Sequence, residues 1–155
     1  MISPELLRRY PFFSQLNERN LKAIAMISEE QEAKAGTILF EEKAPARLLY
    51  FLIDGGIDLI NSVETGIIPK TRKEFHVGEI NPQEVFGISS VIEPHVLNAT
   101  GRAAKDCRFI AIDANALLAL MEMDYQMGFI FMRHIAEAAV ERLIATRVQF
   151  AAAWS

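Results

Sequence analysis

The stretch EVFGISSVIEPHVLNATGRAAKDCRFIAID, residues 84–113, decides how this chain is interpreted. It opens with a turn at Gly87, continues as a short segment of helical character, breaks at Pro94 and ends in an apolar run typical of a strand. Backbone N–H groups at the start of a short helix attract anions, so this order is typical of a phosphate-binding loop. Three interpretations are open at this point: a nucleotide site, a nucleotide site that has lost its ligand, or a corner of a β-roll.

The composition around this stretch predicts one folded domain, residues 1–155, with a substantial core. The 155 residues are 51% hydrophobic and 23% charged, which is far from the composition of a disordered chain. A net charge of −4 without a Lys/Arg cluster argues against direct binding to nucleic acid. The sequence also predicts no signal sequence and no association with a membrane. The single Cys107 excludes an intrachain disulfide, and we therefore expect a soluble, cytoplasmic protein.

Upstream of the opening stretch, the chain changes from helical to strand-like periodicity. Residues 1–27 predict two N-terminal helices, with Ser3 as the cap of the first and Asn17 or Asn20 as the cap of the second. Residues 28–113 contain roughly six to eight short strand-like runs separated by turn signals such as Gly55-Gly56. The predicted class is α+β, mainly β: a double-stranded β-helix or β-roll of the jelly-roll kind.

Downstream, residues 114–155 predict a short linking helix capped by Asp113 and then a long C-terminal helix. At 1.5 Å per residue the long helix would extend for about 45 Å, and one small β-domain cannot easily cover its broad apolar side. We therefore expect a homodimer that buries this helix against its copy. A core helix wrapped by the roll is the alternative. The residues expected on the dimer helix are Phe131, Ile135, Ala138, Val140, Leu143 and Ile144.

The order of elements and three local motifs resemble the cyclic nucleotide-binding domains of the catabolite activator type. The motifs are YPFFSQLNERNLKAIAMI at residues 10–27, KAGTILFEEKAPARLLYFLIDGGIDLI at 34–60 and LNATGRAAKDCRFIAIDANALLALM at 97–121. The resemblance implies an eight-stranded β-roll, a phosphate-binding cassette at residues 86–99, and a long helix that closes over the ligand and forms the dimer. In the activators a helix-turn-helix domain follows that helix. This chain ends at Ser155, so we expect either no DNA-reading unit or a truncated regulator.

The resemblance also assigns roles within the cassette. Its pattern is F-G-E, a short helix, then P-R-[ST]-A, in which the Glu binds the ribose and the Arg binds the cyclic phosphate. Ile88 stands at the Glu position and Leu97, ten residues after Gly87, at the Arg position. The residues expected to line a ligand site are Phe86, Gly87, Ile88, Ser89, Ser90, Leu97, Asn98 and Ala99.

Loss of both charged anchors predicts that cyclic AMP and cyclic GMP do not bind in the usual way. Each charge-assisted hydrogen bond contributes about 1.5 to 3 kcal/mol, so the affinity should fall by at least about 10³-fold. Free N–H groups of the turn at residues 87–90 could still attract a small anion, and Asn98 keeps a donor and an acceptor. A pocket filled by Ile88 and Leu97 is the third possibility. Arg102 should face away from Leu97 and cannot replace the missing Arg.

The remaining polar residues predict no catalytic site, no metal site and no cofactor. His76, His95 and His134 are far apart in sequence, and no acidic residue repeats at a metal-ligand spacing. We expect His95 to be a solvent-facing loop residue, while His134 gives weak support for a haem or pH-sensing role. We therefore expect a regulatory or sensor module, not an enzyme, with a small molecule or a protein as partner. The alternative is the ligand-binding half of a transcription regulator.

Overall fold

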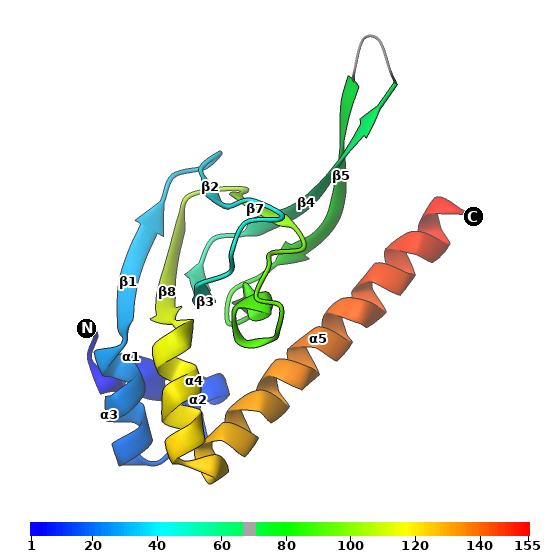
Figure 1. Cartoon of the computed structure of the whole chain (residues 1–155). Helices are drawn as coiled ribbons and strands as arrows, with labels where there is room; N and C mark the ends of the chain where they lie inside the picture. The colour runs from blue at the N-terminus through cyan, green and yellow to red at the C-terminus, as the bar shows by residue number, and fades with distance from the viewer. Residues whose placement is uncertain (67–70) are drawn as a thin grey trace.

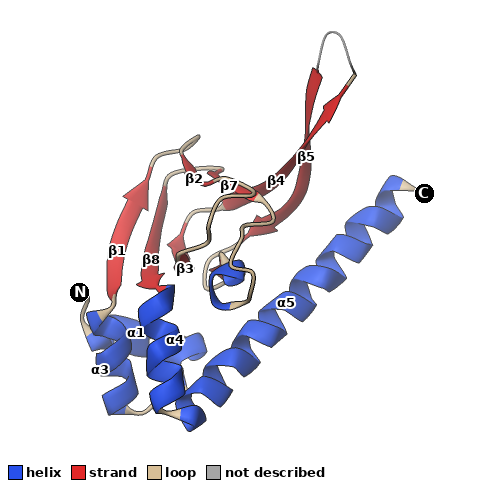
Figure 2. Ribbon diagram, viewed as in Figure 1, coloured by secondary structure: helices blue, strands red, loops and turns tan. Residues whose placement is uncertain are grey.

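The computed structural model describes residues 1–66 and 71–155, which form a β-roll flanked by helices (Figures 1 and 2). One antiparallel sheet has the strand order β1-β8-β3-β6 and the other the order β2-β7-β4-β5. The strands are β1 Ser28–Ala33, β2 Ile38–Phe40, β3 Leu48–Asp54, β4 Ile57–Thr65, β5 Thr71–Ile80, β6 Val85–Phe86, β7 Thr100–Ala103 and β8 Cys107–Asp113. The helices are α1 Pro4–Arg8, α2 Pro11–Ser14, α3 Glu18–Met26, the short 3₁₀ helix η1 Ile88–Val91, α4 Ala114–Met123 and α5 Tyr125–Ala153. The predicted mainly β, jelly-roll-like fold with a long C-terminal helix is confirmed.

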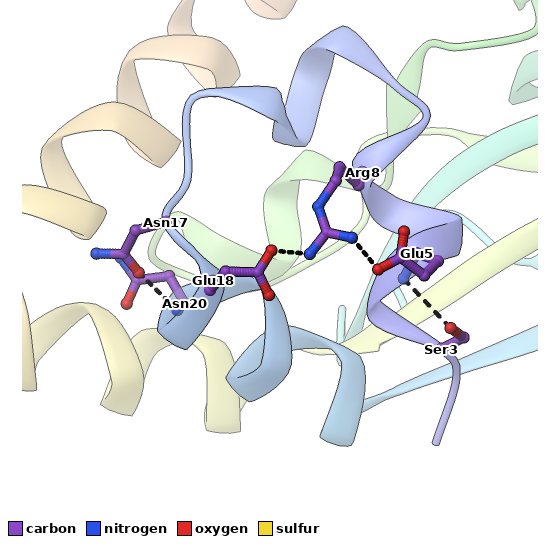
Figure 3. Close-up of polar contacts among 6 residues, drawn as sticks. All are labelled: Ser3, Glu5, Arg8, Asn17, Glu18 and Asn20. Carbon is purple, nitrogen blue, oxygen red and sulfur yellow. Dashed lines mark hydrogen bonds and ion pairs between the residues drawn. The ribbon is translucent and has the colours of Figure 1, made fainter.

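The N-terminal segment forms three helices where the sequence predicted two. Pro11 separates α1 from α2, because proline disfavours helical backbone in the residue before it and fits the first turn of a new helix. Ser3 caps α1 as predicted, and Asn17, rather than Asn20, caps α3 by accepting the Asn20 N–H at 2.8 Å. Figure 3 shows that the Arg8 guanidinium donates to both Glu5 and Glu18 and so connects α1 with α3.

The sheet that contains β3 separates two apolar clusters. Phe51 of β3 faces the helices, while its neighbours Tyr50 and Leu52 face the inside of the roll. Successive side chains in a strand point to opposite faces, so a strand buried on both faces has a nearly continuous apolar sequence. The run LLYFLI at residues 48–53 fits this position, and all of its residues after Leu48 are buried. This sheet is therefore the shared wall between the helical core and the interior of the roll.

The long helix α5 starts inside the helical core and then leaves it. Its buried residues are confined to the first half: Met127, Gly128, Phe131 and Ile135. Its second half extends away from α1–α4 toward the C-terminus, as Figure 1 shows. No helix within the described ranges combines the length and the apolar character that a membrane crossing demands.

Candidate functional site

The entry of the cassette follows β6, a two-residue strand that pairs with β3 through Phe86 and Tyr50. Gly87 then adopts left-handed backbone, with φ of 68°. A Cβ atom at this position would lie 2.9 Å from Cδ2 of Tyr50 and 3.0 Å from the Leu48 carbonyl oxygen. Only glycine satisfies both the conformation and the close approach. The turn predicted at Gly87 is therefore a requirement of the fold.

The helical piece after Gly87 offers less to an anion than the sequence predicted. The Ser90 N–H donates to the Gly87 carbonyl oxygen at 3.0 Å, so it is not free for a ligand. Ile88 is partly buried and packs against the helical core. The Ser90 side chain is 1% exposed, and its hydroxyl has no hydrogen-bond partner among the described residues. The segment is thus used mainly for packing.

The loop between the helical piece and β7 is fixed by contacts of its own. His95 is half-buried, and its Nδ1 lies 2.9 Å from the Ser90 carbonyl oxygen. Its backbone has a φ of 58°, and its N–H donates to the Ile92 carbonyl oxygen at 2.9 Å. The expectation that His95 is simply a solvent-facing residue was wrong, because its ring closes the loop on itself.

The exit of the cassette pairs with the segment between β2 and β3. The Leu97 N–H donates to Ala44 at 2.9 Å and the Leu97 carbonyl oxygen accepts from Lys43 at 2.7 Å. The Leu97 side chain is 7% exposed. The position that the resemblance assigns to a phosphate-binding Arg thus holds a buried apolar side chain, and Ala99 is buried beside the interior of the roll.

A carboxylate that sequence reasoning missed lies next to the exit. One Asn61 side-chain amide donates both to the Asn98 carbonyl oxygen at 2.7 Å and to Glu42 Oε2 at 3.1 Å. The Ser62 N–H donates to Glu42 Oε1 at 2.7 Å. The Ser62 N–H, with a further contribution from Asn61, holds the pKa of Glu42 below its usual value. Glu42 is therefore ionised at neutral pH and places a negative charge beside the cassette. No signal in the sequence distinguished Glu42 from its neighbour Glu41.

Aromatic rings fill the interior of the roll beneath the cassette. Tyr50 stacks on Phe86 with ring centroids 4.9 Å apart, and Phe40 stacks on Tyr50 at 5.5 Å. Phe109 meets the Tyr50 ring edge-on at 5.6 Å. The Phe40 ring also packs directly over the Gly101 backbone, where a Cβ would lie 2.5 Å from Cζ of Phe40. The aromatic rings of β3, β6 and β8 and Phe40 of β2 thus pack against one another within the roll.

A groove of about 520 Å³ lies between α5 and residues 77–85. Arg142 of α5 lines it and donates to the Val85 carbonyl oxygen at 2.6 Å, one residue before the cassette begins. Burial lowers the pKa of the Arg142 guanidinium, and nearby Glu84 and Glu141 act in the opposite direction. His134 also lines the groove, and its Nδ1 lies 2.9 Å from the Phe12 carbonyl oxygen. The helix is thus attached to the roll by polar contacts as well as by its apolar face.

Two of the residues expected at a dimer seam lie elsewhere. Phe131 is 1% exposed and Ile135 is 3% exposed, because both pack into the core formed with α1–α4. Ala138 is partly buried against the same core. Val140, Leu143 and Ile144 are about half exposed, as residues available to a partner would be. The apolar face of α5 is therefore divided between the chain's own core and solvent.

Comparison with known proteins agrees with this architecture. Residues 30–124 match the family described as cyclic nucleotide-binding domain. A crystal structure of a putative cyclic nucleotide-binding protein from Geobacter metallireducens is 34% identical, with a TM-score of 0.77, and the match covers 92% of this chain and 99% of that one. The N-terminal domain of a transcriptional regulator from Streptomyces coelicolor has the same fold at 21% identity, with a TM-score of 0.64 and coverage of 90% and 94%.

One relative is a much longer protein. A putative potassium channel protein of Rhodopseudomonas palustris is 23% identical over 121 residues, which are 78% of this chain. The chain spans about a quarter of that relative, since the match covers 27% of it. The match to residues 30–124 and the 34% identity over nearly the whole length show that this chain belongs to the cyclic nucleotide-binding domain family, whose fold is typical of regulatory and sensor domains.

Proposed function

We propose that this domain is a regulatory module that does not bind cyclic AMP or cyclic GMP in the usual way of its family. Leu97 carries the proposal: its side chain is buried at the position that the resemblance assigns to the phosphate-binding Arg. Ile88, at the position of the ribose-binding Glu, packs against the helical core. A cyclic phosphate placed at this exit would therefore lose its charge-assisted hydrogen bonds and be desolvated against apolar atoms.

The charge near the exit supports the same proposal. The Glu42 carboxylate is connected to the Asn98 carbonyl oxygen through a single Asn61 amide. Two negative charges at short range repel each other, most strongly where water is excluded. Glu42 thus disfavours an anion where the family would bind one. The Glu42 charge also argues against the alternative of a small-anion site built from backbone N–H groups. One of these groups, the Ser90 N–H, already donates to the Gly87 carbonyl oxygen.

Titration calorimetry with cyclic AMP and cyclic GMP tests this proposal. We expect no saturable heat below about 1 mM for the wild type, because the missing bonds correspond to at least about 10³-fold in affinity. The triple variant Glu42→Gln, Ile88→Glu, Leu97→Arg restores the expected anchors and removes the repelling charge, so it should bind more tightly than the wild type. Micromolar affinity of the wild type would contradict the proposal.

The exposed half of α5 supports a second element of the proposal, a homodimer. Apolar residues continue along the helix after it leaves the core, and their side chains are 49% to 65% exposed at Val140, Leu143, Ile144 and Val148. Positions 140, 144 and 148 are four apart and share one face, and 143 lies beside them. Such a stripe on a long helix is suited to packing against a copy of itself. We therefore propose that this stripe forms the contact between two copies of the domain.

Light scattering coupled to gel filtration tests the dimer. We expect the wild type to elute as a dimer, and Leu143→Glu to be monomeric because it would bury a charge in the seam. The matched control is Val63→Lys on β4, which places a charge at an equally exposed apolar residue, 49% exposed, outside α5. A monomeric wild type, or a dimer that Leu143→Glu leaves intact, would overturn this part of the proposal.

A transcription-regulatory role is the second candidate. The domain from Streptomyces coelicolor belongs to a transcriptional regulator, and its match covers 90% of this chain. The proposed sensor module would then act through a DNA-binding domain that follows α5. Sequencing of the reading frame beyond Ser155 distinguishes this candidate, which requires a helix-turn-helix segment downstream.

A further inference from the structure

A cluster of three potential metal ligands lies on the paired strands β4 and β5, outside the cassette. His76 Nε2 is 3.1 Å from Asp58 Oδ1 and 4.0 Å from Glu79 Oε1. One donor atom from each of the three residues lies within 4.8 Å of the other two. The Asp58 side chain is only 27% exposed, and that of His76 is 44% exposed. The Glu79 side chain is 64% exposed, so the cluster combines one imidazole and two carboxylates at the surface of the sheet.

An irregularity in strand pairing brings these residues to the same face. His76 and Glu79 are three residues apart, so a regular strand would direct them to opposite faces. Leu59 pairs with Gly78 but Ile60 pairs with His76, which leaves Val77 as an extra residue in β5. Such a β-bulge shifts the alternation by one residue. The spacing of these residues in the sequence did not predict the cluster, because a β-bulge cannot be recognised from the spacing.

The charges in the cluster favour a bound cation. Asp58 and Glu79 are direct cross-strand partners, and like charges in this arrangement destabilise a sheet. Arg102 is the partner of Asp58 on the other side, in β7. The Arg102 guanidinium, however, lies 3.7 Å from the Glu74 carboxylate. This agrees with the prediction that Arg102 faces solvent and does not replace the missing phosphate-binding Arg. The side chain positioned between the two carboxylates is His76.

We propose that Asp58, His76 and Glu79 form a binding site for a divalent transition metal of the Zn²⁺ type. Zinc accepts imidazole nitrogen and carboxylate oxygen at about 2.0 to 2.2 Å, with water as a fourth ligand. His76 and Glu79, the two more exposed side chains, would have to rotate to bring the donor atoms into this range. Mg²⁺ and Ca²⁺ select oxygen ligands, so an imidazole in the set selects against them. Bound Zn²⁺ neutralises the two opposed carboxylates.

Titration calorimetry of tag-free protein with ZnCl₂ tests this site. We expect one saturable site per chain at pH 7 and no comparable binding of MgCl₂. His76→Gln and Asp58→Asn should each weaken the affinity at least about tenfold. Zn²⁺ should raise the melting temperature of the wild type but not of these variants.

Two control variants separate this site from general binding to surface groups. His95→Asn removes another histidine, and asparagine tolerates the left-handed backbone at that position. Glu32→Gln removes an exposed carboxylate from β1 in the other sheet. Both should bind Zn²⁺ as the wild type does. The proposal is overturned if the wild type shows no saturable binding, or if His76→Gln binds as tightly as the wild type. The NMR signals of the His76 ring, which should shift on Zn²⁺ addition, report the site independently of any variant.

Discussion

The entry and the exit of the cassette differ in which of their features the fold requires. At the entry, Gly87 adopts a backbone conformation and a close approach to Tyr50 that exclude any other residue. At the exit, the backbone of Leu97 pairs with Lys43 and Ala44, and these bonds do not depend on the side chain. A β-roll can therefore keep the complete frame of the cassette while the side chains that bind a ligand change.

The entry should show the largest effect of a single substitution. Gly87→Ala should lower the free energy of unfolding by about 2 to 4 kcal/mol, because the added Cβ combines a strained φ with a clash. Gly36→Ala is the matched control: its φ is also positive, at 89°, but a Cβ there meets nothing within 4 Å. It should cost only about 1 kcal/mol. If urea unfolding shows that Gly87→Ala and Gly36→Ala lower the free energy of unfolding equally, the close contacts at Gly87 do not contribute to the effect.

At the exit, the effect should depend on burial of the side chain. Leu97→Ala should lower the free energy of unfolding by about 2 to 3 kcal/mol, because it removes buried methyl groups and leaves a cavity. The neighbouring Asn98→Ala should change it by less than about 0.5 kcal/mol, since Asn98 is exposed and uses its backbone carbonyl to contact Asn61. The account of a filled exit fails if the Leu97 variant is as stable as the wild type.

The smallest effect is expected at Glu42. Glu42→Gln should lower the free energy of unfolding by about 1 kcal/mol at pH 7, because it weakens the hydrogen bonds from Ser62 and Asn61. The pKa of Glu42 is lowered in the folded state, so its contribution is present above the unfolded-state pKa and is lost as the pH falls through the folded-state pKa. The difference between the variant and the wild type should thus shrink as the pH falls below the ordinary range of a carboxyl group. If the difference in the free energy of unfolding between Glu42→Gln and the wild type does not change with pH, the charge of Glu42 is not its cause.

The fold was predictable because it depends on patterns that repeat along the chain. Cap residues such as Ser3 and Asp113, and the apolar run of β3, identify their elements locally. The division of α5 was not predictable, because Phe131 and Val140 are equally apolar and only the position of the roll decides which of them is buried. The role of Glu42 was not predictable either, because it depends on the contacts of its carboxylate with Asn61 and Ser62, which are distant in the sequence.

The site was predictable in its frame but not in its contacts. The position of Gly87 and the apolar character of Leu97 follow from sequence spacing. The occupied N–H of Ser90 and the contact between His95 and the Ser90 carbonyl depend on the exact path of the loop. The Asp58–His76–Glu79 cluster depends on a bulge, which no sequence motif indicates.

The most direct test of the central claim is an NMR titration of the wild-type protein with cyclic AMP and cyclic GMP. Amide signals of Gly87, Ser89 and Asn98 report binding at the cassette itself, separately from binding elsewhere. We predict no saturable shift of these signals up to about 1 mM nucleotide, the concentration that corresponds to a binding free energy of about −4 kcal/mol. Saturable shifts of the three signals at micromolar nucleotide would contradict the account.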